Sequence, residues 1–204
     1  MHYQILKRGA EADIYLVEWY KNKAISKLRI PKKYRNIQLD RTIRVRRTIH
    51  EANMLHIAKN AGLKTPFIYF LDTKRAEIIM EYIEGENVKD VISKKMGKEI
   101  GKYVSILHNN NIIHGDLTTS NFISNRSNLY LIDFGLSFYS ERIEDIATDI
   151  RVFKEILGSA HINIFEEAFN NFLDGYSQCT KYDLRKILDI VKEIERRGRY
   201  SRIH

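Results

Sequence analysis

Two short segments near the middle of the chain combine residue types that could position a metal ion and a nucleophile. The first is His114–Asn121 (H-G-D-L-T-T-S-N), and the second is Asp133–Gly135 (D-F-G), which begins twelve positions beyond the asparagine and follows an apolar run. At this spacing Asp116 could orient or deprotonate a hydroxyl, while Asn121 and Asp133 could offer a neutral and an anionic oxygen ligand to magnesium. Because phosphoryl transfer depends on positioning and on charge neutralisation, the two segments together predict that chemistry.

A lysine and a glutamate further upstream are placed to complete a phosphate-binding site. Lys27 lies near the middle of the third predicted strand, where a lysine can hold the α- and β-phosphates of a nucleotide. Glu51 lies in the helix predicted next and is the only acidic residue between positions 41 and 60, so we expect it to pair with that lysine. Lys23 is the alternative lysine if the register of the strand differs from the predicted one.

A turn near the N-terminus has a degenerate phosphate-loop sequence. Its residues, Lys7-Arg8-Gly9-Ala10-Glu11-Ala12-Asp13-Ile14, overlay the pattern G-x-G-x-x-G-x-V with Lys7 and Ala12 in place of two glycines. Gly9 still permits close approach of the backbone to phosphates, and Lys7 or Arg8 could add positive charge. By itself the segment would also be consistent with a plain hairpin turn.

The strand predicted near residue 80 leads into the junction between two differently patterned halves of the chain. Its residues are Ile78-Ile79-Met80-Glu81-Tyr82-Ile83. We expect an adenine ring to lie against this backbone beside Met80, with hydrogen bonds to the carbonyl of Glu81 and the amide of Ile83. The competing interpretation is an ordinary strand end.

The elements that must hold these residues change character near residue 85. Before it, hydrophobic periodicity predicts strands and one long helix; after it, the chain is mostly helical around an irregular stretch at 112–138. The predicted strands are 3–6, 14–19, 23–30, 67–71 and 77–82, and the predicted helices are 39–60, 88–94, 98–109, 145–157, 164–176 and 183–197. This order predicts an α+β chain of two lobes, 1–84 rich in strands and 85–204 helical, with a ligand bound in the cleft between them.

The net charge of +8 comes from two local clusters of basic residues. Eleven Lys or Arg residues and one acid, Asp40, lie between Lys21 and Arg47, and a second basic cluster ends the chain. Such clusters attract polyanions, of which nucleic acid is the commonest large one, although a solvated helix face would look the same in sequence. We interpret the chain end as a flexible cationic strip that could contact phosphates through Arg196, Arg197, Arg199 and Arg202.

Composition excludes several classes of protein. The single cysteine, Cys179, excludes an internal disulfide framework and a multi-cysteine metal site. No apolar run approaches the roughly 18 residues of a membrane-spanning helix, and residues 1–6 lack the features of a signal peptide. With 44% hydrophobic and 29% charged residues, the chain is typical of a globular protein, which we expect in the cytoplasm without a membrane partner.

The order of these motifs resembles that of the protein-kinase superfamily over nearly the whole chain. More narrowly, Gly9–Ala12 (G-A-E-A), Arg29–Arg35 (R-I-P-K-K-Y-R) and Arg46–Ala52 (R-R-T-I-H-E-A), with the arginine-rich end, resemble the small atypical kinase/ATPase subunit of the KEOPS complex, PRPK-like and RIO-related. The resemblance implies one protein-kinase-like domain that uses ATP and Mg²⁺ as a serine/threonine kinase and as an ATPase. It also implies work with the tRNA-threonylcarbamoyl transferase subunit, the other KEOPS subunits and tRNA, in forming threonylcarbamoyladenosine at position 37 of tRNAs that read codons beginning with A.

Carried onto this sequence, the resemblance assigns a role to each motif. Asp116, Lys27 and Glu51 would be catalytic, and Asn121 and Asp133 would bind the metal. The ATP-binding residues would be Lys7, Arg8, Gly9, Ala10, Glu11, Ala12, Ile14, Lys27, Met80, Glu81 and Ile83. The basic clusters, including the terminal arginines, would contact tRNA or a partner subunit.

The sequence also departs from ordinary protein kinases. Gly115 stands where an H-R-D arginine would be, so that no basic group awaits a phosphate on an activation loop. The stretch Leu136–Glu144 is too short to form the platform on which a peptide substrate lies, and no A-P-E motif follows it. Asp149, on the next predicted helix, could tie back to the backbone of the catalytic loop or could be an ordinary surface acid.

Two alternative functions remain open at this point. Small-molecule kinases of the aminoglycoside or choline type also contain H-G-D-x-x-x-x-N, but the 62 residues from Arg142 to Ile203 leave little room for their helical insertion. A non-catalytic RNA-binding scaffold with a kinase fold would need none of the five residues Lys27, Glu51, Asp116, Asn121 and Asp133. Both alternatives are therefore less favoured than an ATP-dependent phosphotransferase or ATPase.

Overall fold

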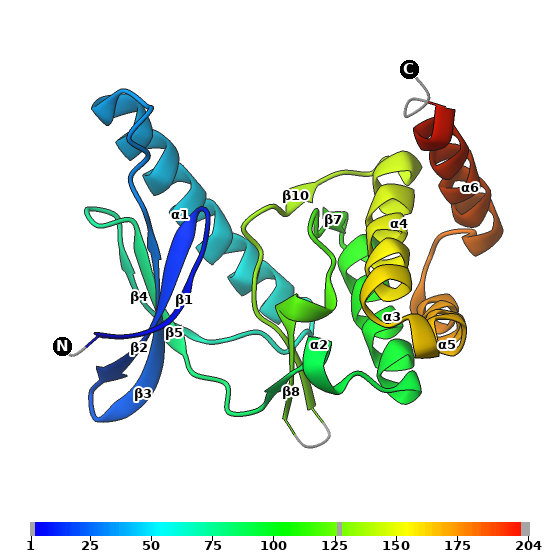
Figure 1. Cartoon of the computed structure of the whole chain (residues 1–204), viewed down its shortest axis with the longest axis horizontal. Coiled ribbons are helices and arrows are strands. Elements are labelled where there is room, and N and C mark those ends of the chain that lie inside the picture. Colours follow the sequence, from blue (N-terminus) through cyan, green and yellow to red (C-terminus); the bar gives the residue numbers. More distant parts are fainter. Residues whose placement is uncertain (1–2, 126–127, 201–204) are drawn as a thin grey trace.

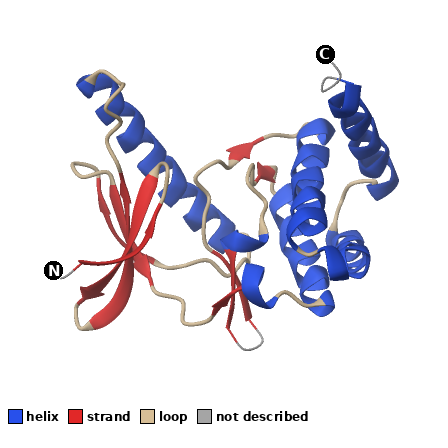
Figure 2. Cartoon of the chain, in the orientation of Figure 1, coloured by secondary structure: helices blue, strands red, loops and turns tan. Residues whose placement is uncertain are grey.

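The protein has a β-sheet region at its N-terminal end and a helical region at its C-terminal end (Figure 1, Figure 2). The computed structural model describes residues 3–125 and 128–200, the last three of these as backbone only. Within these ranges, no helix is both long and apolar enough to cross a membrane. The predicted order, strands with one long helix and then mostly helices, is confirmed.

The N-terminal sheet has five antiparallel strands. In spatial order they are β1 (Tyr3–Arg8), β2 (Ala12–Trp19), β3 (Asn22–Arg29), β5 (Glu77–Glu81) and β4 (Ile68–Asp72). The turn between β2 and β3 holds Tyr20 and Lys21 at φ values of 48° and 68°, the left-handed conformation that suits a tight hairpin between twisted strands. The register pairs Lys27 with Ile14 on one side and with Ile78 on the other, so this lysine lies at the centre of the sheet.

Helix α1 (Ile37–Asn60) runs from the sheet toward the helical region (Figure 1). Asn36 caps its start, because its side-chain oxygen accepts hydrogen bonds from the backbone N–H groups of Gln38 and Leu39. The second half of the helix carries Glu51, which is fully buried, and thereby brings an acidic side chain under the sheet.

The helical region is organised by two helices that approach each other closely. Its helices are α2 (Val88–Val91), α3 (Lys94–Asn109), α4 (Ile143–Ala160), α5 (Phe165–Cys179) and α6 (Leu184–Tyr200). A β-carbon at Gly101 on α3 would lie 2.0 Å from the carbonyl oxygen of Phe172 on α5, and one at Gly175 would lie equally close to Lys98. Glycine at these positions lets the two backbones meet, which a larger residue would prevent.

Short strands and turns connect the two regions. Strands β6 (Glu86–Asn87), β8 (Phe122–Asn125) and β9 (Asn128–Leu131) form a small sheet, β7 (Ile112–Ile113) pairs with β10 (Phe138–Tyr139), and the 3₁₀ helices are η1 (Thr119–Asn121) and η2 (Ile162–Ile164). One hydrophobic core continues from α1 and β5 into α4, as Leu55, Met80, Phe134 and Ile150 illustrate. This shared core fixes the loop at 114–121 relative to the sheet.

Two predictions about the helices are wrong. Residues 88–94 do not form one helix: α2 ends at Val91, and Ser93 has an extended backbone before α3 begins. The flexible cationic strip predicted over residues 196–204 is helical in its described part, because α6 continues through Tyr200. Arg199 therefore belongs to the helix, whereas Arg202 lies outside the described residues.

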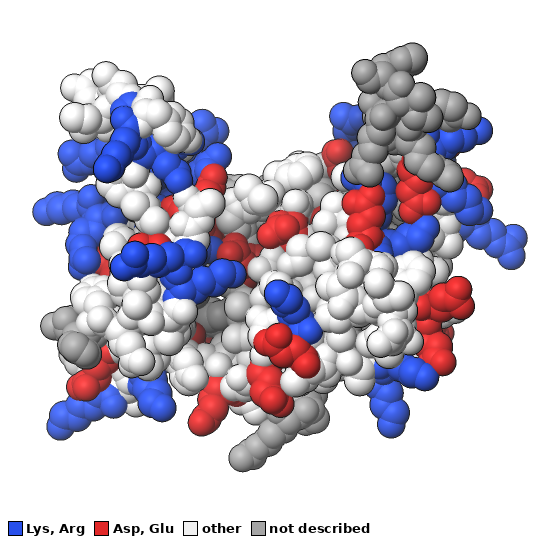
Figure 3. Space-filling model, in the orientation of Figure 1, with Lys and Arg blue, Asp and Glu red and all other residues white. Residues whose placement is uncertain are grey.

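The basic cluster between residues 21 and 47 is not a uniform surface patch. Lys27 and Arg29 are only 7% and 5% exposed, and both point into the protein rather than into solvent. Other Lys and Arg side chains gather over the sheet region and the first half of α1 (Figure 3). The polyanion-attracting charge is thus smaller than the residue count suggests, because two of the cations belong to the interior.

Candidate active site

Two adjoining cavities lie between the N-terminal sheet and the loop at 114–121. The first, of about 350 Å³, has a lining in which half of the residues are charged: Lys7, Glu11, Lys27, Arg29, Asp116 and Asp133. The second, of about 330 Å³, has a mostly apolar lining that includes Leu6, Ile25, Met80, Ile83, Ile123 and Ile132. We call them the charged cavity and the apolar cavity. Lys7, Ile14, Lys27 and Asp133 line both, so the two form one continuous cleft.

Lys27 lies between two carboxylates at the boundary of these cavities. Its Nζ atom donates to Oε1 of Glu51 at 2.5 Å and to Oδ2 of Asp133 at 2.7 Å. Burial alone would lower the pKa of Lys27, but the two carboxylates outweigh it and raise that pKa above its ordinary value. The alternative lysine, Lys23, is exposed and lines neither cavity.

Asp133 is held in its ionised form. Burial would raise the pKa of Asp133, but the ammonium group of Lys27 and the backbone N–H of Gly135 hold it below its usual range. That N–H donates to Oδ1 of Asp133 at 2.8 Å. A charged carboxylate beside a charged lysine can accept a cation and anionic phosphates together.

Asp116 and Asn121 are joined within the catalytic loop. The Nδ2 group of Asn121 donates to the backbone carbonyl of Asp116 at 2.8 Å and to its Oδ2 atom at 3.2 Å. This commits the nitrogen of Asn121 and leaves Oδ1 as the atom that could ligate a cation. Asp116 is exposed and lines the charged cavity, so its carboxylate is accessible to a hydroxyl or a water molecule.

Asp149 on α4 fixes the backbone of the same loop, which confirms the tie that the sequence left open. Its carboxylate accepts hydrogen bonds from the N–H groups of His114 at 2.8 Å and Gly115 at 2.9 Å. Burial would raise the pKa of Asp149, but the hydrogen bond from His108, at 3.2 Å, and these backbone groups lower it. The loop therefore rests on a buried anion rather than on solvent-exposed contacts.

The turn at residues 7–14 borders the charged cavity. The N–H of Gly9 donates to the carbonyl oxygen of Ala12 at 3.1 Å, and a β-carbon at Gly9 would lie 2.5 Å from that oxygen. Only glycine fits this turn. Of the predicted loop residues, Lys7, Gly9, Glu11, Ala12 and Ile14 line the charged cavity. Arg8 and Ala10 line neither cavity, so the structure does not bring these two residues to the cleft.

The predicted adenine-binding residues Met80, Glu81 and Ile83 line the apolar cavity. Sequence reasoning missed the apolar residues that complete this lining: Leu6, Ile25, Pro66, Ile123 and Ile132. A signal for two of them was available, because Ile25 shares a strand face with Lys27 and Ile132 directly precedes Asp133.

Arg29 is a buried cation of the site that sequence reasoning also missed. Its Nη2 group donates to Oε2 of Glu51 at 2.6 Å, and its Nη1 group donates to Oε2 of Glu11 at 3.3 Å. The available signal was the same period of two, which places Arg29 on the strand face of Lys27.

The short segment after Asp133 is held in place without an activation loop. Strand β10 pairs with β7 next to the catalytic loop, and the ring Nε2 of His50 on α1 lies 2.7 Å from the carbonyl oxygen of Ser137. Leu136, Phe138 and Tyr139 along this segment are exposed. The predicted brevity of the segment is observed, since α4 already begins at Ile143.

The oxygen ligands fit a magnesium ion better than a tightly caged metal. Within the described parts of the chain, no group of three or more His, Cys, Asp or Glu residues could hold a metal ion. Mg²⁺ usually takes one or two protein oxygens and completes its shell with water and substrate phosphates. Asp133 and Asn121, which both line the apolar cavity beside the charged one, supply such a pair.

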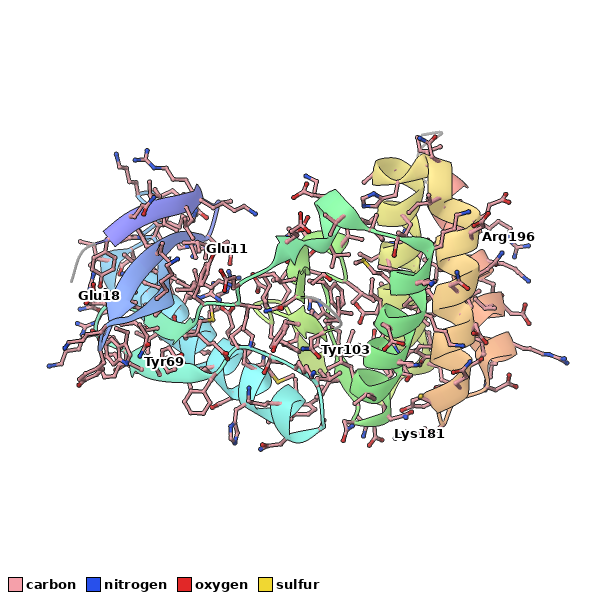
Figure 4. All side chains as sticks on the ribbon, turned by 90° about the horizontal axis from the view of Figure 1, so that it is seen from below. Glu11, Glu18, Tyr69, Tyr103, Lys181 and Arg196 are labelled. Atoms are coloured by element: carbon pink, nitrogen blue, oxygen red, sulfur yellow. The ribbon has the colours of Figure 1, made fainter. Side chains whose placement is uncertain are left out.

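The basic residues near the C-terminal end are remote from the cleft. Figure 4 shows Arg196 at the end of the molecule opposite the sheet region that carries Glu11. Arg197 is exposed and pairs with Glu193 on the same helix at 3.3 Å. The structure therefore does not place Arg196 or Arg197 in the nucleotide-sized cleft.

Comparisons with known proteins agree with this geometry. The protein kinase domain family matches residues 4–159. The chain is 41% identical to the KEOPS complex subunit Bud32 of Pyrococcus abyssi, over 97% of this chain and 96% of that protein. It is 40% identical to a probable serine/threonine-protein kinase BUD32 homolog of Archaeoglobus fulgidus, over 94% of each chain.

Two further similarities concern a longer protein and a solved structure. The chain is 42% identical to a probable bifunctional tRNA threonylcarbamoyladenosine biosynthesis protein of Methanococcus vannielii, but it spans only 36% of that protein's length. The Rio2 kinase of Chaetomium thermophilum, solved as an ADP/Mg²⁺-phosphoaspartate complex, superimposes with a TM-score of 0.62 at 15% identity, over 98% of this chain and 72% of that one. At this identity the likeness concerns the fold.

Proposed function

Because the chain belongs to the protein kinase family, and within it to the family of Bud32 proteins, we propose that it is a Mg²⁺- and ATP-dependent phosphotransferase or ATPase of a KEOPS-type assembly. One observation carries the proposal. Lys27 bridges Glu51 and Asp133 at the same cleft into which Asp116 opens. A structural scaffold has no need of one buried and one partly buried ionic contact on a single lysine at a cavity, since burying charges costs free energy.

The two cavities of the cleft suit two different parts of a nucleotide. The apolar cavity, with Met80, Glu81 and Ile83 along one side, suits the adenine ring, and the charged cavity suits the triphosphate. Lys27 would hold the α- and β-phosphates. Lys7, which stands in place of one of the loop glycines, would add a second positive charge. Residues 1–84 and 85–204 would then be the two lobes of one kinase domain.

The remaining polar groups fit phosphoryl transfer. Asp133 and the Oδ1 atom of Asn121 would hold Mg²⁺, which when bound neutralises phosphate charge. The carboxylate of Asp116 would accept the proton of the attacking hydroxyl or water. Asp149 would hold the loop that carries Asp116 in place beside the cleft, through the hydrogen bonds that it accepts from the backbone of His114 and Gly115.

The names of two relatives support a proposal about the binding partners of this chain. A relative is named as a KEOPS subunit, and another as a longer bifunctional protein of tRNA threonylcarbamoyladenosine biosynthesis. We therefore expect this chain to bind the tRNA-threonylcarbamoyl transferase subunit and to serve modification of tRNA. The basic residues over the sheet region, and Arg196 and Arg197 on α6, are the candidate contacts with tRNA or with a partner subunit.

The proposal is tested by measuring ATP hydrolysis by the purified chain, with and without Mg²⁺, and then with tRNA and a transferase subunit of the KEOPS type. We expect Mg²⁺-dependent turnover that rises when both additions are present. A chain that binds Mg²⁺ and ATP but shows no turnover under any of these conditions would reduce the proposal to nucleotide binding. A chain that binds no nucleotide would overturn it.

A further inference from the structure

Strand β3 presents two cations, not one, to the buried glutamate of α1. Lys27 and Arg29 lie two residues apart and therefore on the same face of the strand. Lys27 donates to Oε1 of Glu51 at 2.5 Å, and Arg29 donates to Oε2 at 2.6 Å. Each oxygen of this fully buried carboxylate thus has its own cation.

The second amino group of Arg29 reaches the phosphate loop. Its Nη1 group lies 3.3 Å from Oε2 of Glu11, in the turn that borders the charged cavity. Arg47, one helical turn before Glu51 on α1, holds both oxygens of Glu11 at 2.5 Å. The loop is therefore tied at one side chain to strand β3 and to helix α1.

This arrangement is costly if it serves only to neutralise Glu51. Arg29 is 5% exposed, and its Nε group is buried without a hydrogen-bond partner in the described part of the chain. Lys27 is shared between Glu51 and Asp133, so Arg29 supplies the second positive charge that balances these two carboxylates, at the free-energy cost of desolvating its guanidinium. The planar fork of that guanidinium also holds a further carboxylate, that of Glu11, through its other amino group.

We propose that Arg29 is a positioning residue that links the phosphate loop to the α1 glutamate through Glu11 and Glu51. This inference rests on the function proposed above. With Arg29 in place, closure of the loop over the phosphates and correct seating of Glu51 against Lys27 are coupled. Glu11 and Glu51 come from different elements, and the guanidinium of Arg29 contacts both carboxylates.

Two substitutions at Arg29 distinguish the effect of its contact with Glu11 from the effect of its contact with Glu51. Arg29→Lys keeps a charge for Glu51 but is too short and not forked, so it loses Glu11. We expect a KM for ATP raised roughly two- to fivefold, the scale of one partly exposed ion pair, with kcat changed less than twofold. Arg29→Met loses both contacts, and we expect kcat to fall as well, by about tenfold or more, because Glu51 loses the cation on its Oε2 atom and no longer holds Lys27 in a fixed position.

The loop end of the link is tested at Glu11 with a matched control. Glu11→Gln weakens the contacts with both Arg29 and Arg47, so it should raise KM at least as much as Arg29→Lys does, at nearly unchanged kcat. Glu18→Gln is the control, since Glu18 is an exposed glutamate of the next strand, β2, that lines neither cavity. Figure 4 shows Glu18 at the far edge of the sheet region and Glu11 on the side facing the helical region. The control should keep wild-type KM and kcat.

The experiment is a steady-state ATP hydrolysis series on the full chain, with thermal unfolding of each variant. If Arg29→Lys and Glu11→Gln lower the melting temperature but keep wild-type KM and kcat, Arg29 is merely structural and the inference is overturned. If Arg29→Met does not fold, the Arg29→Lys and Glu11→Gln variants still test the inference. Absence of ATP turnover and of ATP binding in the wild type would instead overturn the proposed function, and this inference with it.

Discussion

A β-carbon on Gly115 would lie 2.4 Å from the backbone carbonyl oxygen of Leu136. Gly115 also has a φ of +77°, a conformation that side chains other than glycine rarely adopt. The position that carries arginine in an H-R-D motif is therefore closed to any side chain here. The catalytic loop packs directly on the segment after Asp133, which replaces a contact made through an activation-loop phosphate.

Substituting this glycine should damage both stability and activity. Gly115→Ala introduces a strained φ and a contact with the Leu136 backbone, so we expect a loss of about 1–3 kcal/mol of unfolding free energy. We expect kcat to fall by about tenfold or more, because the loop that carries Asp116 must shift. Thermal unfolding and ATP turnover check this result. Gly158→Ala on α4 is the control, since a β-carbon there meets its nearest atom only at 3.7 Å; turnover should stay near wild type, and stability should not fall, because alanine favours a helix more than glycine does.

The buried carboxylate of Asp149 should make stability depend on acid pH. Its pKa is lower in the folded than in the unfolded chain, where the ordinary value is 3.8, so the unfolded state binds more protons. The stabilisation is thus complete above about pH 4 and is lost as pH falls through the depressed pKa. Asp149→Asn should lower the unfolding free energy by about 2–4 kcal/mol at neutral pH and flatten this acid dependence.

The unfolding free energy, measured by urea unfolding at a series of pH values, tests that prediction. Asp189→Asn is the matched control, because the Asp189 side chain is 73% exposed and pairs with Lys192 on the surface. If Asp149→Asn and the control gave the same curves, Asp149 would not hold the catalytic loop.

Alanine substitutions at the two candidate lysines should affect ATP turnover very differently. Lys27→Ala removes the cation between Glu51 and Asp133, so we expect ATP turnover to fall by at least about a hundredfold, in line with loss of a group that neutralises transition-state charge. Lys23→Ala changes an exposed side chain and should leave turnover within a factor of about two. Damage caused by the Lys23 variant rather than by the Lys27 variant would mean that the site is assigned to the wrong lysine.

Isolated protein should phosphorylate added peptides poorly. The segment between Asp133 and α4 is short and is already paired through β10, so it offers no extended platform for a peptide. Phosphate transfer from ATP to a library of Ser/Thr peptides should therefore be far slower than ATP hydrolysis in the same sample. Rapid, sequence-selective peptide phosphorylation by the chain alone would contradict this expectation.

The sequence predicted those parts of the site that local chemistry determines. Lys27 follows from strand periodicity, and Asp116, Asn121 and Asp133 follow from short-range spacing within loops. The period of two places Arg29 on the strand face of Lys27, but its contacts with Glu51 and Glu11 were not predictable, because they depend on how α1 packs under the sheet. A run of basic residues looks like a surface patch until the fold shows which of them turn inward.

Helix ends were the least predictable part of the fold. Nothing in residues 88–94 breaks helical periodicity, yet the chain is extended at Ser93, where it passes from α2 into α3. At the other end, α6 continues past residue 197 because buried Ile187 and Val191 anchor a helix that no proline interrupts. These boundaries depend on tertiary packing, which propensity does not encode.

The proposed function requires that Asp116 and Asp133 act on ATP in one cleft, and ATP turnover in Mg²⁺ by two isosteric variants tests this requirement. Asp133→Asn would weaken the proposed metal site, and Asp116→Asn would remove the carboxylate proposed to accept the proton of the nucleophile. We expect both variants to unfold at temperatures close to that of the wild type, while turnover falls by at least about a hundredfold in each. Wild-type turnover in either folded variant would contradict the proposed function.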